Sequence, residues 1–440
     1  MSRTINGKRK RATQSAMSTL TKREWIAEQA KEHPERVFTS LHHLIDLEWM
    51  IVAYQLTRKD GAVGVDGVTA AEYEEDLESN LEDLLNRIKS GQYKAPPVRR
   101  HYIPKADGTQ RPLGIPTFED KVAQRAILML LESIYEEDFR ECSYGFRPGR
   151  GAHGALDAIW AGVMKERQRW VIDADIRKYF DSIDHTKLRE FLDLRIKDGV
   201  IRRMIDKWLK AGVLEEGQLR RSTEGTPQGG VISPAMANIY LHHVIDKWFE
   251  ETVKPRMKGR CRMVRYADDF VALFEEKVDG ERVYKVLGRR LEKYGLALHE
   301  TKTRYVDMRP EEERKFDFLG FTHVWGRTRK GNRALRQVTA KSRYARAVRG
   351  VVEWCKRNRH LRIDKQAAHL GRVIRGHCNY YGITGNNKRL TQFRYQVERI
   401  WRKWLARRSS KGPVDWRQMK EILRRNPLPS ARIVRSVHTT

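Results

Sequence analysis

The sequence predicts an α+β protein with roughly two to four packed units, and three observations support this. Its 440 residues exceed a single domain of roughly 150 residues. Apolar, β-branched segments over 170–176 and 262–274 predict strands that carry acidic residues. Over 332–410, basic residues alternate with aromatic and aliphatic ones at helical spacing, which predicts a helical C-terminal region.

The composition excludes several classes of protein. Hydrophobic residues make up 40% and charged residues 33% of the chain, and charges interrupt every apolar stretch, so no membrane span is expected. The 4 cysteines are widely spaced and form no Cys-x-x-Cys pair. This argues against a disulfide framework and a cysteine-bound zinc site, and it fits a reducing cytosol.

The charge of the chain indicates a polyanionic partner. The formal net charge is +30, from 87 basic and 57 acidic residues. Residues 321–440 hold 31 of the basic and 5 of the acidic residues, so they carry +26 and the first 320 residues only +4. We therefore expect a nearly neutral body followed by a region that binds nucleic acid, in preference to a membrane surface.

The N-terminal part predicts a flexible arm and two helices. Residues 1–23 are basic, contain no acidic residue and lack the apolar segment of a secretory signal. We expect residues 1–38 to form a flexible basic arm, with a transit peptide as the alternative. Helical patterns follow over 40–57 and over 70–90, and Gly91 closes the second one.

An alternating segment next predicts a β-hairpin. Its two strands are expected over 98–105 and 110–115, joined by the Asp-Gly turn at 107–108. A helix is expected from 119 to about 135.

Two acidic residues share one face of the first apolar strand. Asp173 and Asp175 lie two positions apart, and side chains alternate between the faces of a strand. An ionised acid on a buried strand costs several kcal/mol when it is unpaired. We therefore expect a cation to compensate at least one of the two.

Adjacent acids mark a second place on apolar strands. Asp268 and Asp269 lie where the segment 262–274 turns back on itself. Their carboxylates would repel each other unless a divalent ion lies between them. Two Mg²⁺ ions about 4 Å apart, bridged by carboxylates from neighbouring strands, stabilise the attacking and leaving oxygens in phosphoryl transfer. A solvated turn is the alternative for this pair taken alone.

Short motifs surround these acids in a fixed order. They are Arg-Pro-Leu-Gly-Ile-Pro at 111–116, Ser-Tyr-Gly-Phe-Arg-Pro-Gly at 143–149, Asp175 with Tyr179 and Phe180, Thr-Pro-Gln-Gly-Gly at 226–230 with Ile-Ser-Pro at 232–234, Tyr-Ala-Asp-Asp at 266–269, and Phe-Leu-Gly-Phe at 318–321. From about residue 39 to the C-terminus, the chain resembles a group II intron-encoded reverse transcriptase (maturase). The resemblance implies a right-hand polymerase with fingers, an antiparallel-sheet palm and a mainly helical thumb.

The resemblance also implies a division of the chain. The palm–thumb border is expected near 326–331, where the composition changes from mixed to basic. A Cys- and His-rich endonuclease domain, which longer relatives add, is not expected, so second-strand cutting is not expected either. The segments are a basic arm (1–38), an N-terminal extension and fingers (39–168), the palm with insertions (169–325), the thumb or maturase X domain (326–410) and a short DNA-binding-like tail (411–440).

The catalytic residues follow from the resemblance. Asp175, Asp268 and Asp269 would hold two Mg²⁺ ions, for which Mn²⁺ can substitute. Lys302 would protonate the leaving pyrophosphate. Asp173 lacks the aromatic residue five positions downstream that Asp175 has, so we expect it to be structural.

A nucleotide site is implied as well. Lys105 and Arg111 would bind the triphosphate. Gly229, next to Gln228, would let the backbone approach the template–nucleotide pair because it has no Cβ. Phe180 would exclude a 2′-hydroxyl by its bulk and so select dNTPs, with the preceding tyrosine as the alternative. Solvated cations, an ordinary turn and core packing are the plainer interpretations.

Further residues are implied to contact nucleic acid. Phe318, Leu319 and Gly320 match the element that holds the primer terminus, although they can equally be strand core. The aromatic residues of 332–410 are expected mostly in helix cores, with the basic residues facing phosphates. The other implied nucleic-acid contacts are Arg147, Arg150, Lys388 and Arg389.

The resemblance implies an RNA-directed DNA polymerase that copies intron RNA from a DNA primer or target with dNTPs. It also implies intron RNA binding that assists splicing and mobility, in the bacterial cytoplasm, with organellar import as the alternative. Three other functions stay open: a splicing-only maturase, an RNA-dependent RNA polymerase, and a domesticated or defence-associated reverse transcriptase. Phe180 weighs against the second of these. The sequence gives no oligomeric state.

Overall fold

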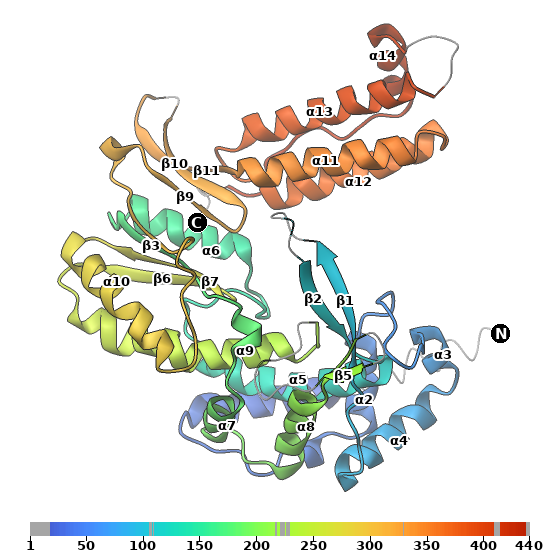
Figure 1. Cartoon of the computed structure of the whole chain (residues 1–440), viewed down its shortest axis with the longest axis vertical. Coiled ribbons are helices and arrows are strands. Elements are labelled where there is room, and N and C mark those ends of the chain that lie inside the picture. The colour runs from blue at the N-terminus through green and yellow to red at the C-terminus, as the bar shows by residue number, and fades with distance from the viewer. Residues whose placement is uncertain are drawn as a thin grey trace.

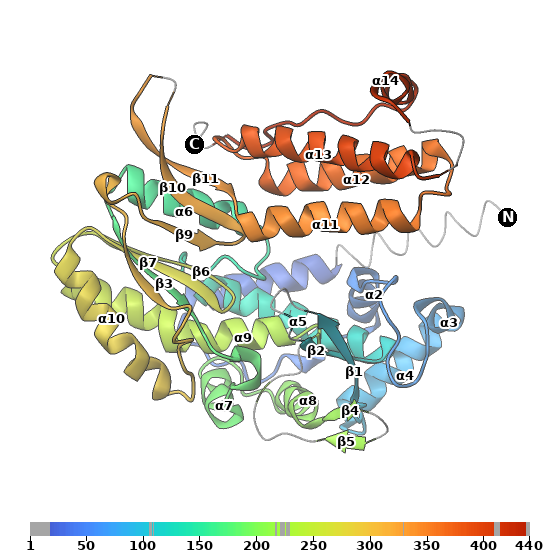
Figure 2. The same ribbon diagram turned by 45° about the horizontal axis from the view of Figure 1, so that its top comes forward.

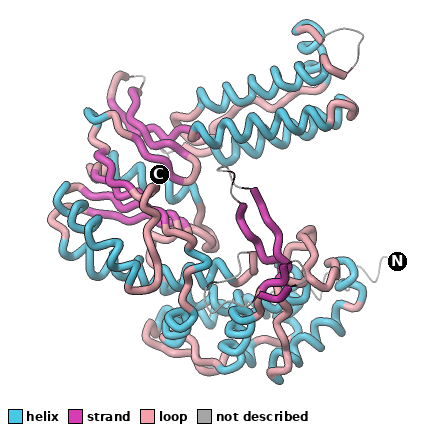
Figure 3. The backbone as a smooth tube through the Cα atoms, in the orientation of Figure 1, coloured by secondary structure: helices cyan, strands magenta, loops and turns pink. Residues whose placement is uncertain are grey.

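Three β-sheets and a helical bundle organise the protein, so the predicted α+β class is confirmed. Figure 3 shows the strands in three separate groups. In Figure 1 the C-terminal helices lie together, apart from the other helices, and a small sheet joins them to the rest. The computed structural model describes residues 18–104, 108, 110–215, 218–220, 225, 229–328, 330–408 and 414–436.

A four-stranded antiparallel sheet in the order β6-β7-β3-β8 forms the palm. Its strands are Cys261–Tyr266, Asp269–Phe274, Trp170–Asp175 and Arg304–Asp307. Ile172 packs into the hydrophobic cluster that joins palm and fingers, here called the main core, whereas Val171 packs on the opposite face with α6 (Ala152–Met164). Because both faces are covered, these strands are apolar almost throughout. The strands predicted over 170–176 and 262–274 are confirmed.

Helices cover the main-core face of this sheet. They are α9 (Ser233–Leu241), its continuation in the wider π-type turns η3 (His242–Asp246) and η4 (Trp248–Val253), and α10 (Lys277–Glu292). Two single helical turns, η5 (Lys254–Arg256) and η6 (Pro310–Glu312), lie in the segments that connect the longer elements.

The fingers surround the long, largely buried helix α5 (Phe118–Asp138), which confirms the helix predicted from 119. The hairpin of β1 (Val98–Pro104) and β2 (Gln110–Ile115) is antiparallel, as predicted, and β1 also pairs in parallel with β4 (Val213–Glu215). The other elements of the fingers are η1 (His42–Leu44), α2 (Leu47–Leu56), α3 (Ala70–Glu75), α4 (Leu77–Ser90), α7 (His185–Asp193), α8 (Gly199–Lys210) and β5 (Gln218–Arg220).

The basic arm is shorter than predicted. Residues 18–32 are helical, and Ile26 and Ala30 are buried in the main core. The guanidinium of Arg195 donates a hydrogen bond of 3.1 Å to the Ala30 carbonyl. The prediction of a flexible arm over 1–38 is therefore wrong for residues 18–38, because this segment holds as many acidic as basic residues and its apolar positions at helical spacing are buried. The residues before 18 lie outside the described part of the chain.

Each of the two predicted N-terminal helices is interrupted. Asp46 separates η1 from α2, and its carboxylate accepts the Trp49 backbone N–H at 3.0 Å as an N-cap. Asp76, with φ −118° and ψ 43°, separates α3 from α4. The Asp46 side chain caps the new helix, whereas at Asp76 the break lies in the backbone, and a periodic hydrophobic pattern reveals neither. Gly91 ends α4 in the left-handed region at φ 80°, as predicted.

The predicted palm–thumb border is wrong. Residues 326–331 lie at the connection between β10 (Phe321–Arg327) and β11 (Arg333–Thr339), within the sheet β11-β10-β9, whose third strand is Lys315–Phe318. The helical thumb begins only at Lys341. The change in composition therefore marks an exposed hairpin end, where basic residues face solvent, and not a boundary between folding units.

Three long helices and one short helix form the thumb (Figure 2). Phe393 and Trp401 are buried in its core, which agrees with the prediction that the aromatic residues mostly pack between helices, whereas Tyr395 is exposed. The helices are α11 (Lys341–Arg357), α12 (Ile363–Tyr381), α13 (Asn387–Leu405) and α14 (Trp416–Arg425).

The C-terminal tail is part of this fold. Met419 and Leu428 are buried in the thumb core. Further along, the Arg435 guanidinium pairs with Asp157 of α6 at 2.6 Å. The described residues 414–436 therefore connect the thumb to the palm and are not a separate tail as predicted, and their contact with DNA stays a prediction.

Candidate active site

The palm sheet brings the acids of its two strands together. β3 and β7 are antiparallel neighbours, and Asp175 lies directly opposite Asp269 in their register. Directly opposed residues in such a pair have Cα atoms about 4.5–5.5 Å apart, with side chains on one face. Asp268 lies in the β6–β7 turn between Ala267 and Asp269. The predicted convergence of Asp175, Asp268 and Asp269 is therefore present.

Burial and neighbouring carboxylates destabilise the charged forms of Asp268 and Asp269. Desolvation by the surrounding protein, together with the charges of Asp268 and Asp175, raises the pKa of Asp269 to about 7, although its side chain still reaches solvent. Desolvation is also the main cause of the raised pKa of Asp268, and the Arg111 and Lys302 charges oppose it. Such a group of like charges attracts a cation.

Two cations neutralise the acids of β3. The Lys302 ammonium donates to Asp175 Oδ2 at 2.7 Å, and the Arg304 guanidinium donates to Asp173 Oδ2 at 2.8 Å. The expectation that a cation compensates at least one of these acids is confirmed. Backbone geometry positions Lys302, because the His299 N–H donates to the Asp175 carbonyl at 2.8 Å and so holds the preceding turn against β3.

The chemistry of the site suits a divalent metal ion. Carboxylate oxygens are the ligands that Mg²⁺ prefers, and a metal charge would oppose the desolvation and the repulsion that together raise the pKa of Asp269. As the side chains are oriented, no three His, Cys, Asp or Glu residues in the described part of the chain are grouped closely enough to hold a metal. Lys302 occupies the Asp175 carboxylate, so metal binding there requires a rearrangement of side chains.

A buried arginine supports the turn that carries the acids. Arg265, fully buried at the end of β6, pairs with the equally buried Asp246 through bonds of 2.7 and 2.5 Å. Its guanidinium also donates to the Ala267 carbonyl at 3.1 Å. Ala267 has φ +57°, a strained value for a residue with a Cβ. Sequence reasoning missed this arginine. The available signal was a cation inside an apolar strand, which requires a buried partner.

A glycine of the loop 143–150 lies against the same turn. A Cβ on Gly145 would stand 2.5 Å from the Ala267 nitrogen, so only glycine fits. The Gly145 carbonyl accepts a 2.7 Å hydrogen bond from Asn238, whose side-chain oxygen in turn accepts from Arg265 at 3.0 Å. The loop and the turn are thus held as one unit.

The structure separates the two aromatic residues that follow β3. They lie in the short helix η2 (Tyr179–Asp181). Tyr179 is buried, and its hydroxyl donates to the Ala237 carbonyl at 2.5 Å. Phe180 is only partly buried and packs on the edge of the main core. Of the two, only Phe180 has a surface available to a ligand.

The predicted nucleotide-binding residues are only partly described. Arg111 is exposed on β2, and its charge acts on Asp268, so it lies within electrostatic reach of the acids. Gly229 has φ +115°, and a Cβ there would stand 2.5 Å from the Gly114 carbonyl of β2. Gly229 thus lies directly against the fingers strand, and its approach to the template–nucleotide pair stays a prediction. Lys105 and Gln228 lie outside the described residues.

The segment predicted to hold the primer forms a tight hairpin turn. Phe318 and Phe321 are paired across β9 and β10, and the two residues between them, Leu319 and Gly320, have φ +50° and +79°. Both phenylalanines are buried, so the strand-core interpretation holds for them. The Leu319 carbonyl accepts a 2.8 Å hydrogen bond from the Tyr380 hydroxyl, which ties this turn to the thumb.

The four predicted nucleic-acid contacts differ in accessibility. Arg147 is buried and donates to Glu136 at 3.0 Å and to the Ser143 carbonyl at 3.0 Å, so its assignment to nucleic acid is wrong. An arginine that satisfies internal carbonyls braces a loop. Arg150 is half-buried and donates to the Glu141 carbonyl at 2.6 Å. Lys388 is exposed on α13, and Arg389 stands 5.6 Å over the Tyr344 ring.

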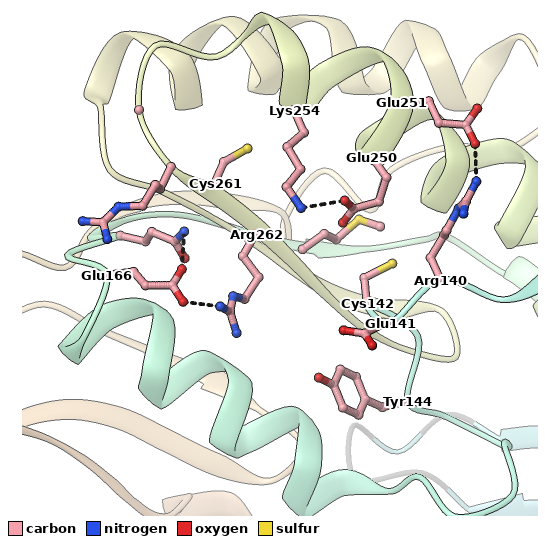
Figure 4. Close-up of a pocket in the computed structure, with 14 residues that line it drawn as sticks. Arg140, Glu141, Cys142, Tyr144, Glu166, Glu250, Glu251, Lys254, Cys261 and Arg262 are labelled. Atoms are coloured by element: carbon pink, nitrogen blue, oxygen red, sulfur yellow. Dashed lines mark hydrogen bonds and ion pairs between the residues drawn. The ribbon is translucent and has the colours of Figure 1, made fainter. Parts of the chain in front are cut away.

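A pocket of about 590 Å³ lies elsewhere on the palm (Figure 4). Its lining includes the ion pairs Arg140–Glu251, Arg262–Glu166 and Lys254–Glu250, the last at 2.7 Å. Within each of these three pairs the opposite charges neutralise each other. Asp175, Asp268 and Asp269 are not among its lining residues.

The chain matches two family models. Residues 103–323 match the model described as reverse transcriptase (RNA-dependent DNA polymerase), and residues 344–422 match the group II intron, maturase-specific domain. Among the helices that the structure describes, none is both long and apolar enough to cross a membrane.

Similar proteins come from bacteria and from a yeast. Group II intron-encoded protein LtrA of Lactococcus lactis subsp. cremoris is 37% identical over 281 residues, which cover 61% of this chain and 46% of LtrA. Protein YkfC of Escherichia coli strain K12 is 35% identical over 331 residues, covering 67% of this chain and 85% of YkfC. A solved telomerase structure from Candida albicans aligns with a TM-score of 0.42 at 14% identity, over 81% of this chain and 65% of that one. The chain thus spans about half the length of LtrA.

Proposed function

The chain belongs to the reverse transcriptase family, among the members with a group II intron maturase-specific domain, and from this premise we propose that it copies RNA into DNA. A primer 3′-hydroxyl attacks the α-phosphate of a dNTP paired to an RNA template, and pyrophosphate leaves. The protein also binds intron RNA and assists its splicing and mobility, in the cytoplasm of a bacterial cell.

One observation carries the proposal. Asp175 opposes Asp269 across two paired strands, and Asp268 lies in the adjoining turn. Three carboxylates at one end of the palm sheet, in a protein with net charge +30, provide a local negative site within a field that attracts nucleic acid. A non-catalytic RNA-binding protein has no need of repelling acids at this place, since they oppose both folding and RNA binding.

Asp175, Asp268 and Asp269 would hold two Mg²⁺ ions, and Mn²⁺ can substitute. When bound, the ions neutralise charge on the attacking and leaving oxygens of phosphoryl transfer. The carboxylates position the 3′ end of the primer, because they determine where positive charge is held beside it. Asp173 stays paired with Arg304 and acts in the sheet.

Side chains around the acids bind and select the nucleotide. Arg111, exposed within reach of Asp268, binds the triphosphate together with Lys105. Phe180 presents its partly exposed ring to the sugar and excludes a 2′-hydroxyl by bulk. Gln228 and Gly229 contact the template–nucleotide pair.

Lys302 delivers a proton to the leaving pyrophosphate. Its side chain is 60% exposed while the ammonium pairs with Asp175, so it can move toward a bound nucleotide. Once that carboxylate has another cation as partner, the ammonium is free to act as a general acid.

The thumb and the β9–β10 turn hold the nucleic acid. Leu319 and Gly320, with Phe318 beneath them, contact the primer terminus. Lys388 and Arg389, on the strongly basic thumb, neutralise phosphates, as does the half-buried Arg150. Because counterions are released for each neutralised phosphate, binding weakens steeply with salt.

Primer extension on an RNA template tests the proposal. The Asp268→Ala, Asp269→Ala double variant should lose extension and keep its affinity for RNA. The control is Asp206→Ala, which removes a carboxylate paired with Arg189 on the fingers at 2.7 Å and should extend normally. Extension by the double variant at the wild-type rate would refute the site.

Sugar selection separates a reverse transcriptase from an RNA polymerase. Wild-type protein should incorporate dNTPs in strong preference to rNTPs, and Phe180→Ala should accept both. Tyr179→Phe is the matched control, because it removes only a buried hydroxyl bonded to the Ala237 carbonyl. It should leave the preference unchanged. Equal use of rNTPs by the wild type would favour the RNA polymerase alternative.

A further inference from the structure

The loop 143–150 is fixed in place beside the β6–β7 turn. Its Tyr144 N–H donates to the Arg265 carbonyl at 2.8 Å, and the Ser143 hydroxyl accepts from the Arg265 guanidinium at 2.7 Å. Arg147 braces the loop from inside. The loop therefore has little freedom to change shape when a ligand binds.

One aromatic side chain of this rigid loop points outward. Phe146 is 57% exposed, the largest fraction among the exposed large hydrophobic side chains of the described residues. Its backbone has φ +56°, a left-handed value that a residue with a Cβ rarely adopts. Exposure of a phenyl ring and a strained backbone both oppose stability. Such a combination is typical of a site kept for contact with a ligand.

The position of the Phe146 ring indicates which ligand it contacts. Its centroid is 6.3 Å from that of Tyr266, the residue paired with Asp269 across the β6–β7 hairpin. Phe146 also lines a small pocket together with Val231, two residues after Gly229. Whatever lies over the acids and reaches the Gly229 loop therefore also lies over this ring.

We propose that Phe146 supports the end of the template–primer duplex, packing against sugars and base edges beside the acids. This role deepens the proposed function and rests on it. A duplex with an RNA strand has a wide, shallow minor groove, whose sugars and base edges a flat ring can contact. Because an aromatic face accepts any base or sugar, the contact is independent of sequence. The loop that the sequence assigned to nucleic acid through Arg147 thus contacts it through Phe146.

Duplex affinity, measured without catalysis, tests this contact. In an Asp268→Asn background, fluorescence anisotropy would give the Kd for a labelled DNA primer annealed to an RNA template. Phe146→Ala and Phe146→Gly should each weaken duplex binding about tenfold, within the range measured for single base–aromatic contacts. Phe146→Trp should bind within about twofold of the parent, because it restores an aromatic face. Single-stranded RNA should bind all variants alike.

Two variants exclude a folding defect. Phe146→Gly removes the ring and also the Cβ that strains a residue at φ +56°, so its thermal midpoint should equal or exceed that of the parent. Leu194→Ala truncates another strongly exposed hydrophobic side chain, 54% exposed, at the end of α7. It should leave duplex affinity unchanged.

The outcomes separate this inference from the proposed function. Normal primer extension by the wild type, with unchanged duplex affinity in Phe146→Gly, overturns the role of Phe146 alone. If the wild type neither extends primers nor prefers a duplex to a single strand, the proposed function falls, and this inference with it.

Discussion

The buried pair of Arg265 and Asp246 offers the sharpest prediction about how the site is built. Both side chains have no exposed area, and two bonds of 2.7 and 2.5 Å join them. Asp246→Ala leaves the guanidinium buried without its counter-charge. Loss of one partner of a buried pair costs about 3–5 kcal/mol. The two charge-assisted hydrogen bonds, at roughly 1.5–3 kcal/mol each, give a similar sum.

A loss of this size is large against the typical stability of about 5–15 kcal/mol. In a unit of 150–250 residues, 1 kcal/mol corresponds to about 2–4 °C, so the thermal midpoint should fall by roughly 10 °C. Differential scanning fluorimetry would measure it. The control Asp206→Ala breaks a pair with Arg189 whose side chains are 30% and 34% exposed, and it should cost less than about 1 kcal/mol.

A double variant separates stability from activity. Arg265→Met with Asp246→Ala removes the unpaired charge and should recover much of the lost stability, because apolar replacement of a buried pair is tolerated. Methionine cannot donate to the Ala267 carbonyl, so the turn that carries Asp268 loses its support and primer extension should stay low. A cost below 1 kcal/mol for Asp246→Ala, or full extension by the double variant, would refute the reasoning.

Three other changes follow from the geometry. The pKa of Asp269, raised by burial and by neighbouring carboxylates from 3.8 to about 7, means that its contribution to stability is present below pH 3.8 and lost as pH rises through 7. In chelator, Asp269→Asn should therefore melt higher than wild type at pH 8 but not at pH 4, and equal midpoints at pH 8 would contradict this. Gly229→Ala places a Cβ 2.5 Å from a carbonyl of β2 and should raise the KM for dNTPs at least severalfold. Gly331→Ala, strained at φ +85° but in open space, should not, and equal kinetics for the two would count against the close approach. Arg435→Glu and Asp157→Arg should each free the tail for limited proteolysis, since their 2.6 Å pair anchors it, and the charge-reversed double variant should restore protection. Resistance of both single variants would show that the pair does not hold the tail.

The sequence predicted the parts of the site that depend on local periodicity. An apolar strand that carries acidic residues is unusual, so each of the two strands could be recognised from its own sequence. Asp175 and Asp269 converge because their strands pair. Tyr179 and Phe180 show the limit of this reasoning. Both are aromatic neighbours, and only the packed structure shows which is buried.

Features made by tertiary contacts were not predictable. Arg265 pairs with Asp246 on another element, and no spacing rule connects them. Arg147 was predicted to contact nucleic acid. It is buried instead, because its guanidinium donates to the Arg140 and Ser143 carbonyls. The helix over 18–32 was missed because the basic run of residues 1–23 overlaps its start, while the few apolar positions that pack it into the core come later.

Metal binding tests the central claim most directly. Titration of Mn²⁺ into the protein, followed by electron paramagnetic resonance, should show binding by the wild type and its loss or marked weakening in Asp175→Asn, Asp268→Asn and Asp269→Asn. Asp173→Asn, whose carboxylate pairs with Arg304, should bind Mn²⁺ normally. Wild-type affinity in the three variants, or loss in Asp173→Asn alone, would contradict a metal site shared by β3 and the β6–β7 turn.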